Sequence, residues 1–206
     1  KQLGVEAKII GSNATSSQNV TGINITGGNT VNVTSNVVNS LSTSGSNMSG
    51  ITIGAATAVD ISANVVNTLS ATAASSTVTG IATSATATNV FRNKVYDLQT
   101  TGATGSVFGF LASGAASTFY DNLVGDLRAP AASNAASPSV VGLGSAGAAT
   151  MNAYDNTIYL AGTSTGANFQ TAVVNVPSAT TLTLRNNVLV NLSTPTGSGR
   201  AVGLWR

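Results

Sequence analysis

Apolar and polar residues alternate along most of this chain in short stretches, which is typical of β-strands with one buried face. The segment from Val31 to Leu41 shows the alternation clearly, and a near copy runs from Val59 to Leu69, 28 residues later. The chain shows no helical period of apolar residues. The pattern therefore predicts an all-β chain built from a repeated unit.

One asparagine recurs in each copy of the unit and allows the copies to be aligned. The intervals between the aligned asparagines are 28, 29, 29, 34 and 31 residues. A period in this range indicates a solenoid, in which each unit buries its apolar side by stacking on its neighbours. The aligned residues are Asn36, Asn64, Asn93, Asn122, Asn156 and Asn187.

Alignment on the asparagine separates three apolar columns from a polar one, and we expect the apolar columns to face the core and the polar column to face solvent. The apolar residues three positions before the asparagine are Val33, Ile61, Val90, Phe119, Ala153 and Leu184. Those two positions after it are Val38, Val66, Val95, Val124, Ile158 and Leu189. Those five positions after it are Leu41, Leu69, Leu98, Leu127 and Leu192, with Leu160 one residue early. The polar residues four positions before it are Asn32, Asp60, Asn89, Thr118, Asn152 and Thr183.

A second marker, a glycine that follows an apolar residue by two positions, keeps phase with the asparagine. It occurs at Gly22, Gly50, Gly80, Gly109, Gly142 and Gly203, and we expect Val174 to replace it in one copy. A degenerate first copy is predicted from Leu3 to Ile10, with Val5 and Ile10 facing inward and Lys8 in the place of the asparagine.

These features predict a right-handed parallel β-helix of about seven coils of 28–34 residues. The right-handed sense follows from the preference for right-handed crossovers between parallel strands. The stacked asparagines are expected to form an internal hydrogen-bonded ladder that fixes the register of the coils, because a buried amide without a partner costs about 1–3 kcal/mol. Residues 1–206 are interpreted as a single solenoid segment of a longer repeat array, since no polar cap is apparent at either end.

Composition excludes several function classes. Charged residues make up only 7% of the chain, and no Lys/Arg cluster forms the footprint of a nucleic-acid-binding protein. The chain contains neither cysteine nor histidine, which excludes disulfides, thiol nucleophiles and most zinc sites. No apolar run reaches the length of a membrane span. We therefore expect no metal, no cofactor, no nucleic-acid partner and no membrane span.

The columns seen in Val31 to Leu41, Val59 to Leu69 and Leu182 to Leu192 resemble the β-strand repeats of very large secreted bacterial surface proteins. The resemblance implies a rigid stalk, an adhesin, a filament component or the cargo of a secretion system. It also implies an extracellular or cell-surface location. The implied partners are neighbouring repeats of the parent chain, surface glycans or a protein secretion machine. The same solenoid is found in polysaccharide lyases and glycoside hydrolases, so the fold alone does not decide the function.

An enzymatic alternative rests on the position just before the asparagine. Asp121 and Asp155 occupy it on adjacent coils, Arg92 precedes them and Asn186 follows. Stacked coils place such residues near the separation of about 5–5.5 Å between the two carboxylates of a retaining glycosidase. The alternative is an exposed column in which Arg92 neutralises Asp121, and we favour it because no second catalytic cluster accompanies the pair.

Two further features of the alignment suggest binding sites. Asp97 and Asp126 share a column that continues at Asn191, and they predict either a cation site or an ordinary polar turn. Phe91, Tyr120 and Tyr154 share the column two before the asparagine, which Arg185 continues, and they predict an exposed stack that can contact a carbohydrate. Stacking between coils alone also accounts for these aromatic residues.

The sequence as a whole favours a non-enzymatic structural or adhesive segment of a secreted or cell-surface bacterial protein. The repeat occupies nearly all of the chain, and no convincing catalytic constellation accompanies it. The second hypothesis is a carbohydrate-active or carbohydrate-binding β-helix that uses Arg92, Asp121 and Asp155 beside the aromatic column.

Overall fold

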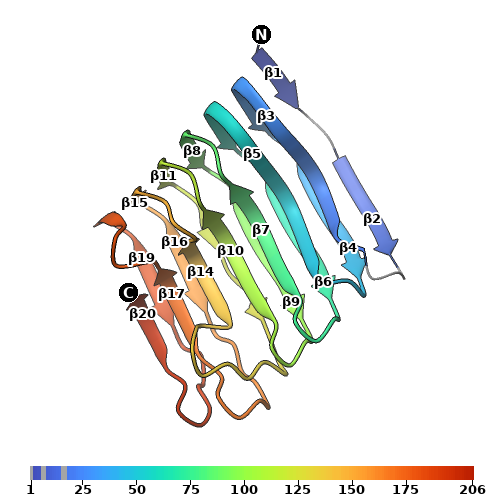
Figure 1. Cartoon of the computed structure of the whole chain (residues 1–206), viewed down its shortest axis with the longest axis vertical. Helices are drawn as coiled ribbons and strands as arrows, with labels where there is room; N and C mark the ends of the chain where they lie inside the picture. The colour runs from blue at the N-terminus through green and yellow to red at the C-terminus, as the bar shows by residue number, and fades with distance from the viewer. Residues whose placement is uncertain (1, 6–7, 15–17) are drawn as a thin grey trace.

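The computed structural model of the chain is a β-solenoid of about six turns, in which parallel strands lie side by side from the N-terminal to the C-terminal end (Figure 1). The structure describes residues 2–5, 8–14 and 18–206, with side chains from residue 18 onward. All regular elements of these residues are strands, and none is a helix. The predicted all-β class and the predicted stacked repeat are therefore confirmed.

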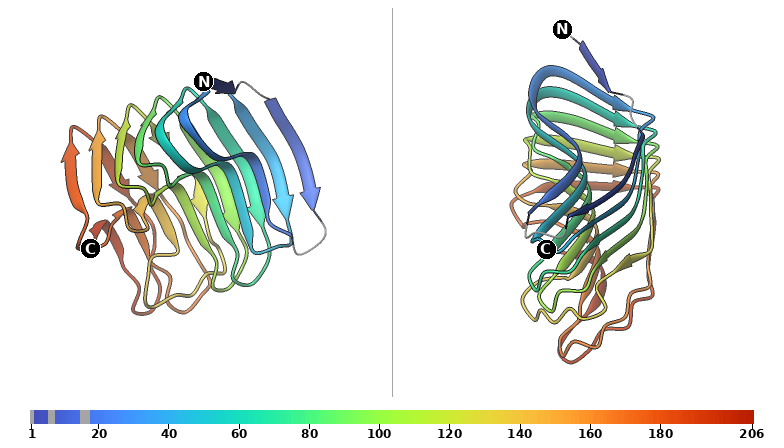
Figure 2. Two further views of the ribbon diagram at one scale, coloured as in Figure 1. Left: turned by 45° about the horizontal axis from the view of Figure 1, so that its top comes forward. Right: turned by 90° about the vertical axis from the view of Figure 1, so that its right-hand side faces the viewer.

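Each turn contributes strands to three faces, and the further views show the chain winding from one end of the stack to the other (Figure 2). The first face contains the N-terminal parts of β3 (Val20–Thr34) and β5 (Asn47–Ser62), followed by β7 (Thr77–Thr83), β10 (Ser106–Ala112), β14 (Val140–Ser145), β17 (Thr171–Asn175) and β20 (Ala201–Trp205). The second face contains β1 (Gln2–Val5), the C-terminal parts of β3 and β5, β8 (Ala87–Phe91), β11 (Ala116–Tyr120), β15 (Thr150–Tyr154) and β18 (Thr181–Arg185). The third face contains β2 (Lys8–Ala14), β4 (Val37–Thr43), β6 (Val65–Ala71), β9 (Lys94–Thr100), β12 (Leu123–Val124), β13 (Leu127–Arg128), β16 (Thr157–Leu160) and β19 (Val188–Asn191).

Equivalent residues of successive coils pair directly, so that like side chains form columns along the axis. On the second face Val33 pairs with Ile61, Ile61 with Val90, and Val90 with Phe119. This register is the one that the aligned asparagines predict. Because side chains alternate across a strand, a slip of one residue would turn every buried residue toward solvent. The apolar columns therefore fix the register together with the asparagines.

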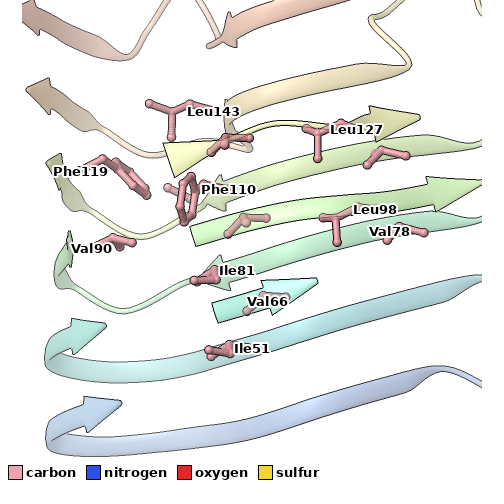
Figure 3. Close-up of a cluster of buried hydrophobic side chains, with 14 of the residues drawn as sticks. Ile51, Val66, Val78, Ile81, Val90, Leu98, Phe110, Phe119, Leu127 and Leu143 are labelled. Carbon is pink, nitrogen blue, oxygen red and sulfur yellow. The ribbon is translucent and has the colours of Figure 1, made fainter. Parts of the chain in front are cut away.

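The core lies between the three faces and runs the length of the solenoid. The columns three before and two after the asparagine are at most 2% exposed in the copies aligned on Asn36 to Asn156. Phe110 and Phe119 pack across the interior at 5.6 Å between ring centroids, beside Ile81, Leu98 and other labelled side chains (Figure 3). Each fully buried Val, Leu or Ile side chain stabilises the fold by about 1.5–3 kcal/mol relative to exposure.

The glycine column faces the interior where the first face approaches the third. A Cβ at Gly80 would overlap Val95 Cγ1 and would lie 2.6 Å from the carbonyl oxygen of Gly109. The register places Val173, rather than the predicted Val174, in this column, because Ala172 pairs with Val141 and Val174 pairs with Leu143. In the coils that carry it, the glycine allows the backbone to approach the neighbouring coil and the third-face side chains closely.

The N-terminal copy is shifted from the prediction by one residue. Val5 pairs with Val33 as expected, but Lys8 pairs with Val37, and Ile9 instead of Ile10 pairs with the core residue Val38. The prediction that Lys8 takes the place of the ladder asparagine is therefore wrong. Residues 6 and 7 lie outside the described residues.

The coils are of two kinds, and the difference explains the displaced leucine. In four coils the residue four after the asparagine has a left-handed backbone, with φ between 49° and 57°, at Ser40, Thr68, Asp97 and Asp126. This kink changes the phase of the strand, so that the leucine five after the asparagine points inward. Leu160 and Asn191 stand at the fourth position without the kink and follow simple alternation.

Two predicted core residues of the last copy are exposed. Leu192 is 65% exposed, because the unkinked strand turns Asn191 inward, where its amide bonds to Thr171 and to the Val202 carbonyl. Leu184 is 37% exposed because β18 is the terminal strand of its sheet in the described residues.

Candidate functional site

The six asparagines form a continuous hydrogen-bonded ladder inside the bend between the second and third faces. In each step the backbone N–H and the side-chain Nδ2 of one asparagine both donate to the Oδ1 of the next. For Asn64 and Asn93 these distances are 3.0 and 2.9 Å. The same Nδ2 of Asn64 donates to the carbonyl of Val33 on the preceding coil at 2.8 Å. Each of the four inner rungs, from Asn64 to Asn156, therefore connects three successive coils.

The residue before each asparagine also has a left-handed backbone. Its φ lies between 54° and 59° at Ser35, Ala63, Arg92, Asp121, Asp155 and Asn186. Asparagine and aspartate tolerate this conformation better than other residues with a side chain. The aspartates of this column thus have a conformational reason to be there that does not involve catalysis.

The structure assembles the predicted Arg92, Asp121 and Asp155 column on neighbouring coils. The Arg92 Nε lies 4.0 Å from the Asp121 Oδ2, and the two side chains are 72% and 48% exposed. Asp155 is exposed and makes no ion pair within residues 18–206. The arrangement is that of the exposed column, with Arg92 beside Asp121 and water around both.

The second acidic pair, Asp97 and Asp126, already has a cation between its members. The guanidinium of Arg128 contacts the Asp97 carboxylate, and its Nε lies 3.3 Å from the Asp126 Oδ1. This geometry supports the polar-turn interpretation, because the arginine occupies the place that a bound cation would take. Among the described residues no three His, Cys, Asp or Glu side chains gather in a way that could hold a metal ion.

The aromatic column is interrupted halfway. Phe91 and Tyr120 stack face to face, with centroids 4.7 Å apart and planes within 3°. Tyr154 instead interacts with Arg185, whose Cζ lies 5.6 Å from the ring centroid. Tyr120 and Tyr154 are paired in the sheet, yet their rings form no stack in the part of the chain with described side chains.

A surface hollow of about 460 Å³ opens where the stack is interrupted. It is lined by Thr118, Tyr120, Tyr154, Asp155, Arg185 and Asn186. Burial raises the pKa of Tyr120, the Asp60 and Asp121 carboxylates raise it further, and Arg92 lowers it. The Tyr120 hydroxyl therefore stays protonated at neutral pH. The hollow is not apparent from the sequence, although the 34-residue interval between Asn122 and Asn156 separates two of the coils that line it.

A second hollow of about 330 Å³ lies at the other end of the same step. It is lined by Asp126, Leu127, Arg128, Pro130, Tyr159, Ala161, Gly162 and Thr163. It forms where a kinked coil meets an unkinked one: β13 pairs with β9 but not with β16. Much of its polar lining is already engaged in the Asp97, Asp126 and Arg128 cluster.

The described residues include no helix with the length and apolarity needed to cross a membrane. Comparison of the chain with protein-family models, with curated proteins and with solved structures finds no match. The residues and their geometry are therefore the basis for a functional proposal.

Proposed function

We propose that this chain is a rigid structural and adhesive segment of a large secreted or surface-attached bacterial protein. The observation that carries the proposal is the unbroken asparagine ladder, which runs from Asn36 to Asn187 with every step hydrogen-bonded. A ladder of this kind connects each coil to its neighbours along the whole length of the segment.

Stiffness follows from the way the coils are joined. Strands on all three faces pair with the next coil, and the ladder and core reinforce the same register. With about 4.8 Å between coils, six steps extend the segment by roughly 29 Å. Bending such a rod would lengthen the hydrogen bonds on its convex side and compress the packed core on its concave side. A protein that must hold a binding site away from a cell surface needs this stiffness.

The surface chemistry and the repeat pattern support a role outside the cell. Outward positions carry mainly Ser, Thr, Asn and Ala, and charged residues make up only 7% of the chain. The column pattern of Val31 to Leu41 resembles that of secreted bacterial surface proteins. Neighbouring repeats of a longer parent chain would continue the stack.

The acidic column favours this role over a carbohydrate-active enzyme. Asp121 lies beside Arg92, and the left-handed backbone accounts for the aspartates at this position. The side chains project into water, whereas acid–base pairs gain strength from surroundings that exclude water. We therefore assign Arg92, Asp121 and Asp155 to the surface of the scaffold.

The location can be tested with antibodies raised against the folded chain. On intact cells of the producing organism the antibodies should label the surface, or should detect the protein in the culture medium. An antibody against a cytoplasmic protein serves as the control and should label only permeabilised cells. Labelling that appears only after permeabilisation would contradict the proposal.

A further inference from the structure

We propose that the hollow between Tyr120 and Tyr154 binds a neutral saccharide ring. This inference does not depend on the structural role of the rod, because it rests on the side chains of three neighbouring coils. The hollow of about 460 Å³ falls in the range of about 300–1,000 Å³ usual for small-ligand pockets.

The shape of the site suits a sugar ring. Phe91 covers one face of the Tyr120 ring at 4.7 Å and fixes the orientation of that ring. Tyr120 also lines the hollow, and Tyr154 lines it from the next coil. The apolar C–H face of a sugar ring packs well on an aromatic ring held in this way.

Polar groups line the hollow beside the two rings. Asp155 can accept hydrogen bonds from sugar hydroxyls, Arg185 can donate them, and Asn186 and Thr118 can do both. The Arg185 guanidinium is held over the Tyr154 ring at 5.6 Å, which limits its freedom before a ligand arrives. The protonated Tyr120 hydroxyl adds a further donor.

The charges of the lining favour a neutral ligand. The lining contains one cation, Arg185, and one anion, Asp155, and neither forms an ion pair within residues 18–206. The formal charges cancel, so the hollow does not favour an acidic sugar, whose carboxylate would lie near that of Asp155. A saccharide with hydroxyl groups only can use both side chains.

The residues that line the hollow differ from their equivalents in earlier coils. The column that supplies Asp155 contains Ser35 and Ala63 in earlier coils, and Asp121 lies beside Arg92. Two of its three coils are separated by the longest interval between ladder asparagines, 34 residues.

The test uses the intact chain on an array of neutral and acidic oligosaccharides, followed by calorimetric titration of the best neutral ligand. We expect neutral saccharides to bind and acidic ones of equal length to bind more weakly. The variants Tyr154→Ala and Asp155→Asn should each weaken binding by about tenfold or more. The first removes an aromatic ring, and the second replaces one of two charged acceptor oxygens by an NH₂ donor.

Matched controls lie close by. Tyr159→Ala removes an exposed tyrosine outside the hollow, and Asp121→Asn removes the equivalent carboxylate one coil earlier. Both controls should bind as the wild type does, and circular dichroism should show the same fold in all variants. The proposal is overturned if no neutral saccharide binds, if acidic saccharides bind more tightly, or if folded Tyr154→Ala and Asp155→Asn bind like wild type.

Discussion

Replacing Asn93 by alanine removes a rung from the middle of the ladder. The Asn93 side chain is completely buried and takes part in five hydrogen bonds. Its Nδ2 donates to the carbonyls of Ile61 and Phe91 and to Asn122 Oδ1, at 2.8, 3.0 and 3.0 Å. Its Oδ1 accepts from the N–H and Nδ2 of Asn64.

The loss can be estimated from the groups that remain. The backbone N–H of Asn64 would be buried without its acceptor, which costs about 1–3 kcal/mol. The Asn64 Nδ2 keeps its bond to Val33, and Asn122 Oδ1 keeps the bond from the Asn93 backbone, so these losses are smaller. The carbonyls of Ile61 and Phe91 each lose a donor. Together with a small cavity, these effects should destabilise the chain by about 2–5 kcal/mol.

The variant Asn93→Asp separates shape from hydrogen bonding. It retains an oxygen to accept from Asn64, but it places an oxygen opposite the three acceptors that Nδ2 now contacts. These oxygens and burial should raise the pKa of the introduced carboxyl above about 3.9, its ordinary value. Its destabilisation should therefore be largest at neutral pH and should diminish as the pH falls and the carboxyl is protonated.

The assay is denaturant or thermal unfolding of the purified chain, followed by circular dichroism. A loss of 2–5 kcal/mol corresponds to about 4–20 °C in the unfolding midpoint of a domain of this length. Asn152→Ala is the control, because Asn152 lies on an outward column. If Asn93→Ala costs no more than Asn152→Ala, the ladder does not stabilise the stack.

Three further predictions test other parts of the account by the same unfolding assay. Gly80→Ala should lower the free energy of unfolding by about 1–3 kcal/mol, because the added Cβ overlaps Val95 and the Gly109 carbonyl. Gly203→Ala is the control and should cost much less, because a Cβ there meets nothing within 4 Å. Equal losses in the two variants would refute close packing at this column. Ala63→Asn should stabilise the chain by about 0.5–1 kcal/mol by relieving a left-handed alanine with φ of 54°, whereas Ala58→Asn at an exposed strand position should not stabilise it. The folded pKa of Tyr120 is raised above 10, so the stability of the wild type should fall as the pH rises above 10. The stability of Tyr120→Phe should fall less over the same pH range. Identical alkaline stability profiles would contradict the assigned environment of Tyr120.

The sequence was sufficient to predict the stacked coils, the ladder and most inward columns. Asn36 to Asn187 recur with the apolar residues of the core, and a strand period of two leaves one way to bury both. The outward polar column from Asn32 to Thr183 followed from the same alternation. Such agreement is expected where local pattern and global packing point to one structure.

The left-handed kinks could not be predicted from alternation alone. The leucine five after the asparagine is an odd number of residues from the valine two after it, so both can face inward only if the strand changes phase between them. The kinked residues Ser40, Thr68, Asp97 and Asp126 are turn-forming or small polar residues, which was the available signal. The last copy lacks the kink, so the prediction that Leu192 faces the core is wrong.

The candidate site depended on side-chain geometry that the alignment does not contain. The shared column of Phe91, Tyr120 and Tyr154 was visible in the sequence, but the interruption between Tyr120 and Tyr154 was not. Arg128 follows a core leucine, and nothing in the sequence pattern indicated that its side chain lies between Asp97 and Asp126. Both features depend on the conformations that long side chains adopt between coils of unequal length.

The most direct test of the account is to detect the ladder hydrogen bonds in solution. Nuclear magnetic resonance can measure scalar couplings across a hydrogen bond, here between the backbone nitrogen of one asparagine and the side-chain carbonyl carbon of the next. The account predicts such couplings from Asn36 to Asn64 and onward to Asn187, with slow exchange of the donor amides. Rapid exchange of these amides, without any coupling between successive asparagines, would contradict it.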